Sequence, residues 1–216
     1  MVERSEQSGG LKLGLVGLLI AVGVLSWLLW GASNAASQAA DQLCDPLDGV
    51  NFTDVSDTDY AAGYILCAKV LRLATGKTDG TFAPNEHITR AQMATFLIRL
   101  WRDSLNKTCP TTTTPFTDIA NNSARQDITC LYALGITKGA TPTTFEPNAT
   151  LTTSQITRFL ARLLNKTNPN ACDLTGNELA KAAQCLVGLN IAPNTAEAQS
   201  STQATRAQMI VYLIGT

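Results

Sequence analysis

Histidine is almost absent from this chain of 216 residues, in which His87 is the only one. Zinc sites built on several histidines are therefore excluded, and a Ser-His-Asp centre would depend on that single residue. Charge is also scarce, because acidic and basic side chains make up 15% of the residues and nearly cancel to a net charge of -1. Proteins that bind nucleic acid neutralise its phosphates with a basic surface, so no nucleic-acid partner is expected. No motif indicates a metal ion or another cofactor.

Long apolar runs are limited to one segment, residues 13–30, where Ser26 is the only polar side chain. Such a run is long enough to cross a bilayer. Small residues follow it, so residues 1–36 form either a signal peptide cleaved after Ala35 or Ala36, or an uncleaved membrane anchor. As an anchor, the segment would place Trp27 and Trp30 at the outer interface. Both alternatives put the rest of the chain outside the cytoplasm.

Six cysteines are present, and an even number of them is compatible with either disulfides or metal binding. Export from the cytoplasm favours disulfides, and the lack of further histidines argues against zinc. No Cys-x-x-Cys motif occurs, so a redox-active thiol is not expected.

An internal repeat occupies the remainder of the chain. The motif Phe82-Ala83-Pro84-Asn85 returns 63 residues later as Phe145-Glu146-Pro147-Asn148. A shorter third copy lacks this motif, but its residues 205–209 reproduce residues 89–93 without change. Self-similarity of this kind indicates stacked structural units. We expect units at residues 37–105 and 106–168 and a degenerate unit at residues 169–216.

Each copy contains two cysteines, and the repeat therefore predicts one disulfide within each copy. A bridge inside a short loop stabilises such a unit by about 3 kcal/mol in the chain-entropy model. The predicted pairs are Cys44 with Cys67, Cys109 with Cys130, and Cys172 with Cys185.

The first half of a copy predicts a helix followed by a loop. In the first copy, Ser56 to Asp59 has the composition of a helix start, and the apolar pattern continues to Thr75. We expect Gly76 to end this helix in a left-handed conformation. Asp79 and Gly80 then predict a tight turn.

The second half of each copy predicts an amphipathic helix. Thr89 and Gln92 have the spacing of a capping box, and the pattern recurs from Thr152 and from Thr205. One helix cannot bury its apolar face alone, so the three are expected to pack as a central bundle. In the first copy the apolar residues at i, i+3, i+4, i+7 and i+8 are Met93, Phe96, Leu97, Leu100 and Trp101.

These motifs together resemble the S-layer homology family over residues 45–216. The family pattern is Phe-x-Asp-Val, then Gly-Ile-x-x-Gly, Asp-Gly-Thr-Phe-x-Pro and Thr-Arg-Ala-Glu. The cysteine pairs are similar to a disulfide-bearing variety in Gram-positive, actinobacteria-like sequences. The matching segments are Phe52-Thr53-Asp54-Val55, residues 79–84 and 88–92 in the first copy, and Phe116-Thr117-Asp118-Ile119, residues 134–139 and 145–147 in the second.

The resemblance implies a mainly α fold in which three tandem helix–loop–helix repeats form a pseudo-threefold prism around a three-helix bundle. The apolar N-terminal helix would precede this prism. It further implies a non-enzymatic cell-envelope module that binds a cell-wall polysaccharide, including pyruvylated polymers, without a covalent bond. The protein would lie at the cell wall or be secreted, with residues 13–30 in the membrane if they are not removed. Its oligomeric state is left open.

The same resemblance assigns the ligand to the start of the second helix, where an arginine helps to hold it. Arg90 and Arg206 occupy this position, and an arginine there adds a forked donor for a carboxylate at a positive helix end. A solvated charge is the alternative for both arginines, and pure helix capping is the alternative for the neighbouring threonines and glutamines. The other candidate ligand-binding residues are Thr89, Gln92, Thr205, Gln208, Gly76 and Gly80.

Departures from the family pattern reduce the number of complete sites. Thr153 stands where the second copy should have an arginine, and the third copy lacks the Asp-Gly-Thr-Phe loop. All three copies have Gln where the family has Glu. A structural or protein-interaction domain with a decayed glycan site is therefore the alternative function. An enzyme is not expected, because Asp54, Asp57 and Asp59 have the pattern of a helix start rather than of a catalytic cluster.

Overall fold

The computed structural model describes residues 52–214, which are mainly helical and contain isolated β-bridges but no strand. Residues 1–36 and Cys44 lie outside this part of the chain. None of the helices in residues 52–214 is long and apolar enough to cross a membrane. The helices are α3 (Ala62–Val70), α4 (Arg90–Arg99), the π-helix η2 (Leu100–Ser104), α5 (Arg125–Ala133), α6 (Thr153–Thr167), α7 (Glu178–Gly188), α8 (Thr195–Ala198) and α9 (Arg206–Ile214).

The first helix of the first copy, α3, is shorter than its apolar pattern predicts. Residues before Ala62 form a turn instead, in which the backbone N–H of Ser56 donates to Asp59 Oδ2 at 2.9 Å. At the other end Arg72, with φ 57°, takes the left-handed position that we expected Gly76 to hold. Leu73 N–H donates back to the carbonyl of Ala68 at 2.8 Å, which closes the helix end over buried Leu73. The predicted helix over Ser56–Thr75 is therefore wrong at both ends.

The second helices begin where the sequence predicts. Before α4, the N–H of Gln92 donates to Thr89 Oγ1 at 3.2 Å and the N–H of Thr89 donates to Gln92 Oε1 at 3.0 Å. The same reciprocal pair precedes α6, and Thr205 and Gln208 form it before α9. The apolar residues predicted to face the core in the first copy are all buried, from Met93 in α4 to Trp101 in η2, and Met209 to Leu213 in α9 are buried as well.

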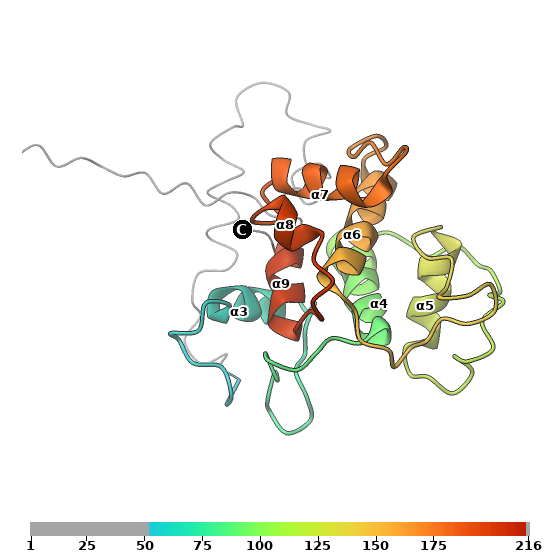
Figure 1. The fold of residues 1–216 in the computed structure, drawn as a ribbon. Helices are drawn as coiled ribbons and strands as arrows, with labels where there is room; N and C mark the ends of the chain where they lie inside the picture. Colours follow the sequence, from blue (N-terminus) through green and yellow to red (C-terminus); the bar gives the residue numbers. More distant parts are fainter. Residues whose placement is uncertain (1–51, 215–216) are drawn as a thin grey trace, which may run out of the picture.

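Helices of different copies pack against one another in a cyclic order. The second helix of the first copy, α4, packs on α5 of the second copy, and α6 of the second packs on α7 of the third. The second helix of the third copy, α9, then packs on α3 of the first. Figure 1 shows α3 beside α9 on one side of the molecule and α5 beside α4 on the other. Each copy therefore depends on its neighbours for burial.

Three backbone hydrogen bonds join the residues just before the second helices. Ile88 N–H donates to the carbonyl of Ala204 at 3.0 Å, Ala204 N–H to that of Leu151 at 2.8 Å, and Leu151 N–H to that of Ile88 at 3.0 Å. All three residues are buried. The N-terminal ends of α4, α6 and α9 consequently converge on one closed ring of hydrogen bonds.

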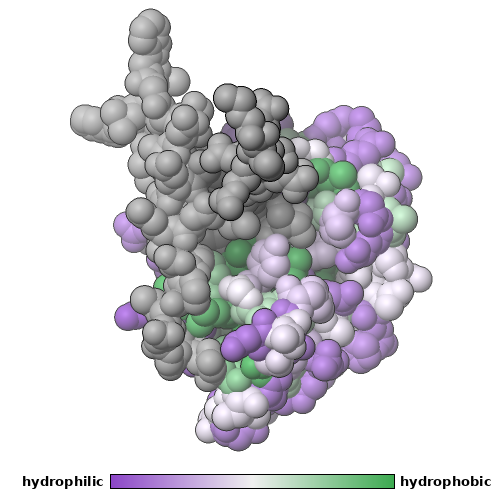
Figure 2. All heavy atoms as spheres, turned by 90° about the vertical axis from the view of Figure 1, so that its left-hand side faces the viewer, coloured by the Kyte–Doolittle hydropathy of each residue, from purple (hydrophilic) through white to green (hydrophobic). Residues whose placement is uncertain are grey.

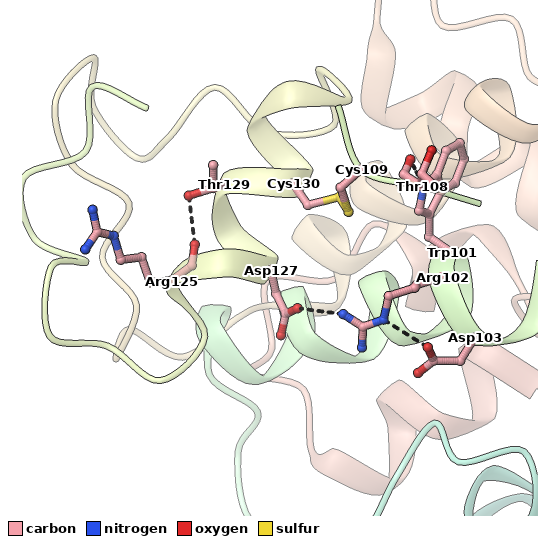
Figure 3. The surroundings of a disulfide bond; sticks show 9 residues. All are labelled: Trp101, Arg102, Asp103, Thr108, Cys109, Arg125, Asp127, Thr129 and Cys130. Carbon is pink, nitrogen blue, oxygen red and sulfur yellow. Dashed lines mark hydrogen bonds and ion pairs between the residues drawn. A yellow bond between two sulfur atoms is a disulfide. The ribbon is translucent and has the colours of Figure 1, made fainter. Parts of the chain in front are cut away.

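Disulfides fasten the copies internally. Cys109 is bonded to Cys130 of α5, and Cys172 to Cys185 of α7, as predicted. Figure 3 shows the first bridge beside α5, with Asp127 of the same helix directed at Arg102 of η2. Cys67 is also disulfide-bonded, and Cys44, its predicted partner, lies outside the described residues.

The face viewed in Figure 2 is the side of the molecule on which α3 lies in Figure 1. Apolar residues gather near its middle, and hydrophilic residues border them. Tyr60, just before α3, is the large hydrophobic side chain that is exposed among residues 52–214.

Candidate ligand-binding site

Arg90, the first residue of α4, reaches across to the second copy. Its Nε donates to the carbonyl of Phe145 at 2.6 Å, and its guanidinium lies 4.6 Å from the centroid of the Phe145 ring. The ring of Phe159 lies on its other flank, at 5.8 Å. The residue is 6% exposed. Arg90 is therefore a buried cation in an aromatic environment rather than the solvated surface charge that was its alternative.

The Arg90 guanidinium keeps unused hydrogen-bonding capacity. Its Nη2 is buried and has no hydrogen-bond partner. Burial lowers the pKa of Arg90, while the nearby carboxylates of Glu146 and Asp118 act in the opposite direction. An arginine still carries its charge at neutral pH. A buried donor without an acceptor costs about 1–3 kcal/mol, and an incoming acceptor would recover that energy.

Arg206 repeats the arrangement between the third copy and the first. Its Nε donates to the carbonyl of Phe82 at 2.8 Å, and its guanidinium lies 4.8 Å from the Phe82 ring and 5.8 Å from the Phe96 ring. It is 5% exposed, and burial lowers its pKa against the effect of Glu86 and Asp54. Both candidate arginines thus occupy equivalent inter-copy positions.

The backbone donors at these helix starts are already used. Arg90 N–H donates to the carbonyl of Ala149 at 2.9 Å, Ala91 N–H to that of Pro147 at 2.9 Å, and the third donor, Gln92 N–H, binds Thr89 Oγ1. The helix that starts at Arg206 uses its first three donors in the same way. These two helix starts therefore offer an anion no free N–H group among their first three residues, because the loop of the neighbouring copy and the capping threonine supply the acceptors. Only side chains remain to hold an anion here.

The junction between the second and third copies lacks the arginine. Thr153 occupies its position, and Thr157 Oγ1, one turn further along α6, donates to the carbonyl of Ala198 at 2.8 Å. Tyr212 stands where the other copies have phenylalanine, and its buried hydroxyl has no partner. Burial raises the pKa of Tyr212, with a further contribution from Glu197. This junction is therefore neutral where the other two are cationic.

The loops that accept from the arginines are held by aspartates, which the sequence analysis did not recognise. Phe82 N–H and Ala83 N–H donate to the two carboxylate oxygens of Asp54 at 2.7 and 2.6 Å. Ala83 has a left-handed backbone, with φ 58°, and this conformation lets two consecutive N–H groups point at one carboxylate. The motif Phe-Thr-Asp occurs in two copies, and this recurrence could have identified the aspartate from the sequence.

Asp118 performs the same function in the second copy. It accepts from Phe145 N–H at 2.9 Å and from Glu146 N–H at 2.7 Å. Desolvation acts to raise the pKa of Asp118, but these two backbone donors, with Arg90, leave it below its usual value. The carboxylate therefore fixes the loop whose Phe145 carbonyl anchors Arg90.

The other candidate residues have structural partners. Thr89, Gln92, Thr205 and Gln208 form the helix caps described above, beside the two arginines. Gly76, with φ 72°, packs on Phe52, and a Cβ there would collide with the Phe52 ring and with the carbonyl of Thr81. Gly80, with φ 83°, faces open space in the tight turn. Within residues 52–214 no group of three or more His, Cys, Asp or Glu residues is placed to hold a metal ion.

The model of the S-layer homology domain matches residues 51–94 and 115–155, which lie in the first two copies. These two segments are S-layer homology repeats. S-layer homology domains are cell-wall attachment modules, and the protein is located at the cell surface, outside the cytoplasm.

Curated relatives share this part of the chain. A "Cell surface protein" of Thermoanaerobacter kivui is 32% identical over 66% of the chain and 19% of its own length. A "Cellulosome-anchoring protein" of Acetivibrio thermocellus is 32% identical over 54% of the chain and 26% of its own length. An "Endoglucanase" of Bacillus sp. is 34% identical over 50% of the chain and 12% of its own length. The chain therefore spans about a quarter or less of each of these relatives.

Proposed function

We propose that residues 37–216 bind a cell-wall polysaccharide without a covalent bond and attach the protein to the wall. The observation that supports this most directly is Arg90, a buried cation with an unpaired Nη2 at a junction between S-layer homology repeats. The names of the matched cell-surface and cellulosome-anchoring proteins agree with this function. The proposal assigns no catalytic role to the chain.

The chemistry of Arg90 favours an acidic sugar as the ligand. Its Nε is fixed by the Phe145 carbonyl, so the terminal nitrogens are oriented before a ligand arrives. A carboxylate, such as that of a pyruvate ketal, would supply the acceptor that Nη2 lacks. Because the guanidinium lies against aromatic rings and is shielded from water, an ion contact there is stronger than on an open surface.

The copies are proposed to bind unequally. Arg90 and Arg206 provide one site at each of two junctions, whereas the junction at Thr153 has no cation. Capping by Thr89 and Gln92, and by Thr205 and Gln208, positions the arginines, and exposed Gly80 leaves room for a sugar near the first loop. Gly76 contributes by fixing the turn rather than by leaving space for a sugar, because the Phe52 ring occupies the position that a Cβ at Gly76 would take.

We further infer that the three copies form a pseudo-threefold prism, with the ligand between copies. The cyclic helix packing and the ring of backbone hydrogen bonds support this arrangement. If residues 13–30 are retained, they would attach the same chain to the membrane, so that it tethers membrane to wall.

Sedimentation with cell-wall sacculi tests the proposal. The wild-type ectodomain, residues 37–216, should sediment with sacculi that retain their polymers and stay in solution with polymer-stripped sacculi. An Arg90→Gln, Arg206→Gln double variant should bind at least about tenfold more weakly, since each lost charged hydrogen bond removes about 1.5–3 kcal/mol.

Arg125→Gln is the matched control, because Arg125 is an exposed arginine at the start of α5. Circular dichroism must show that each variant is folded. Unchanged sedimentation of the folded double variant would contradict the arginine site. Failure of the wild type to sediment would contradict wall binding itself.

A further inference from the structure

Basic side chains gather along α6 of the second copy and beside the loop that follows α5. Three of them lie on α6 at positions i, i+4 and i+8 and therefore share one face of that helix. A fourth comes from the loop after α5. This basic patch consists of Arg158, Arg162, Lys166 and Lys138.

Hydrogen bonds and a close approach bring three of these residues to one place, beside the loop that carries the fourth. Arg162 donates through Nε and Nη2 to the carboxylate of Glu178 at 2.5 and 2.8 Å, and through Nη1 to the carbonyl of Ile136 at 3.0 Å. The ammonium of Lys166 lies 4.0 Å from where a side chain at Gly135 would begin. The α6 face therefore lies along the 135–138 loop that carries Lys138.

The electrostatics of Glu178 agree with this geometry. The hydrogen bonds from Arg162 lower the pKa of Glu178 most, against the effect of burial, and the charges of Arg158 and Lys138 lower it further. Among residues 52–214, only Arg162 of the four cations has an ion-pair partner. Lys138 and Lys166 are exposed, and Arg158 is half-buried. Within residues 52–214, Lys138, Arg158 and Lys166 thus form no ion pair, and the patch keeps an excess of positive charge in a chain whose net charge is -1.

The first copy shows that the fold does not require this patch. At the positions 63 residues earlier it has Thr95, Arg99 and Asp103 in place of the three cations of α6, and Thr75 in place of Lys138. Arg99 keeps the structural contact, donating to the carbonyl of Leu73 at 3.2 Å as Arg162 does to Ile136. Arg162 therefore joins α6 to the loop after α5 and to α7, and the other three cations are additional.

We propose that the basic patch binds consecutive anionic groups of a cell-wall polymer, as a second contact beside the arginine junctions. This inference rests on the proposed wall attachment. Positions four apart on a helix are spaced by about 6 Å along its axis, so the long side chains can contact successive charges of an extended chain. Charge complementarity selects a polyanion, because the patch holds four cations beside one carboxylate, that of Glu178.

A triple variant, Lys138→Gln, Arg158→Gln, Lys166→Gln, removes the additional cations and leaves the Arg162–Glu178 pair intact. Its matched control, Arg72→Gln, Lys107→Gln, Arg125→Gln, removes three exposed cations elsewhere. The ectodomains are titrated with poly(glycerol phosphate), polygalacturonate, neutral dextran and anionic lipid vesicles at low and high salt. The two polyanions distinguish phosphate from carboxylate as the preferred group.

We expect the wild type and the control to bind at least one polyanion and not dextran. The patch variant should bind about tenfold more weakly at low salt, since each exposed ion contact contributes up to about 1 kcal/mol, and the difference should shrink as salt screens the charges. Equal binding by the patch and control variants would overturn the proposal, as would binding to anionic lipid vesicles but to neither polymer.

The Arg90→Gln, Arg206→Gln variant distinguishes binding at the arginine junctions from binding at the basic patch. Its binding to poly(glycerol phosphate), which carries no carboxylate, should stay within about twofold of that of the wild type. If the arginine variant loses binding to sacculi while the patch variant binds both sacculi and polyanions like the wild type, the proposed function stands and the patch is refuted. If polyanion binding depends on the patch but the wild type does not sediment with sacculi, the patch stands and the proposed function is refuted.

Discussion

Replacing Asp118 by alanine removes the carboxylate that holds the loop beneath Arg90. Two backbone donors lose their acceptor, Phe145 N–H at 2.9 Å and Glu146 N–H at 2.7 Å. The Phe145 amide is partly buried and recovers little hydration, whereas the Glu146 amide is exposed and recovers more. Glu146 also has a left-handed backbone, with φ 59°, which the carboxylate helps to hold.

The magnitude follows from these two hydrogen bonds. A hydrogen bond to a charged group contributes about 1.5–3 kcal/mol when it is protected from water, and less for an exposed carboxylate such as Asp118. We therefore expect Asp118→Ala to lower the free energy of unfolding by about 2 kcal/mol, which corresponds to a fall in Tm of about 4–8 °C for a domain of this size. Urea unfolding followed by circular dichroism at pH 7 measures it.

Asp57→Ala is the matched control. Asp57 is exposed and makes no hydrogen bond or ion pair within residues 52–214, so its replacement should change stability by less than about 0.5 kcal/mol. Equal losses of stability for the two variants would refute the role assigned to the Asp118 carboxylate.

The pH dependence gives a second criterion for Asp118. Its pKa is lower in the folded state than the ordinary value of about 3.9, so its contribution to stability is fully present above that value. The contribution is lost as pH falls through the lowered pKa. The difference between wild type and Asp118→Ala should therefore shrink in acid, and a constant difference would contradict the assigned cause.

Three further substitutions test the packing between copies and within them. Tyr212→Phe removes a buried hydroxyl without a partner and should raise Tm or leave it unchanged, whereas a loss above about 1 kcal/mol would mean that the hydroxyl is satisfied. Thr157→Val should cost about 1–2 kcal/mol in urea unfolding because a buried carbonyl loses its donor, against about 0.5 kcal/mol or less for Thr129→Val, whose hydrogen bond to the Arg125 carbonyl is exposed. Converting Cys172 and Cys185 to serine opens a loop of 13 residues and should cost about 3 kcal/mol in guanidinium unfolding, and an unchanged midpoint would contradict the chain-entropy account.

Local features of the fold were predictable from the sequence. Thr89 and Gln92 identified the start of α4 because a capping box joins residues three apart, and the buried series from Met93 followed from helical periodicity. The repeat identified two disulfide pairs because each bridge lies within one copy. The start of α3 was not predictable in this way, since the same Ser and Asp side chains stabilise a turn as readily as a helix end.

The candidate site depended on longer-range contacts. The sequence placed Arg90 at a helix start, but its burial depends on Phe145, 55 residues away. Asp54 was assigned to a helix start because its partner, Phe82 N–H, is 28 residues away and belongs to a loop without periodicity. The occupied donors of the helix starts likewise depend on carbonyls of the next copy. Spacing along the chain cannot specify such contacts between copies.

The packing of α3 on α9 has a consequence for the order in which the protein assembles during export. The Ile88–Ala204 hydrogen bond and the α3–α9 contact both join the first copy to the third. A chain that crosses the membrane from its N-terminus presents the first copy long before the third arrives to cover it, and contacts of large sequence separation form slowly. The Cys109–Cys130 and Cys172–Cys185 disulfides span 21 and 13 residues, so each can close as soon as its own copy has emerged. Oxidation in the extracytoplasmic space can therefore protect partly assembled copies until α9 completes the structure.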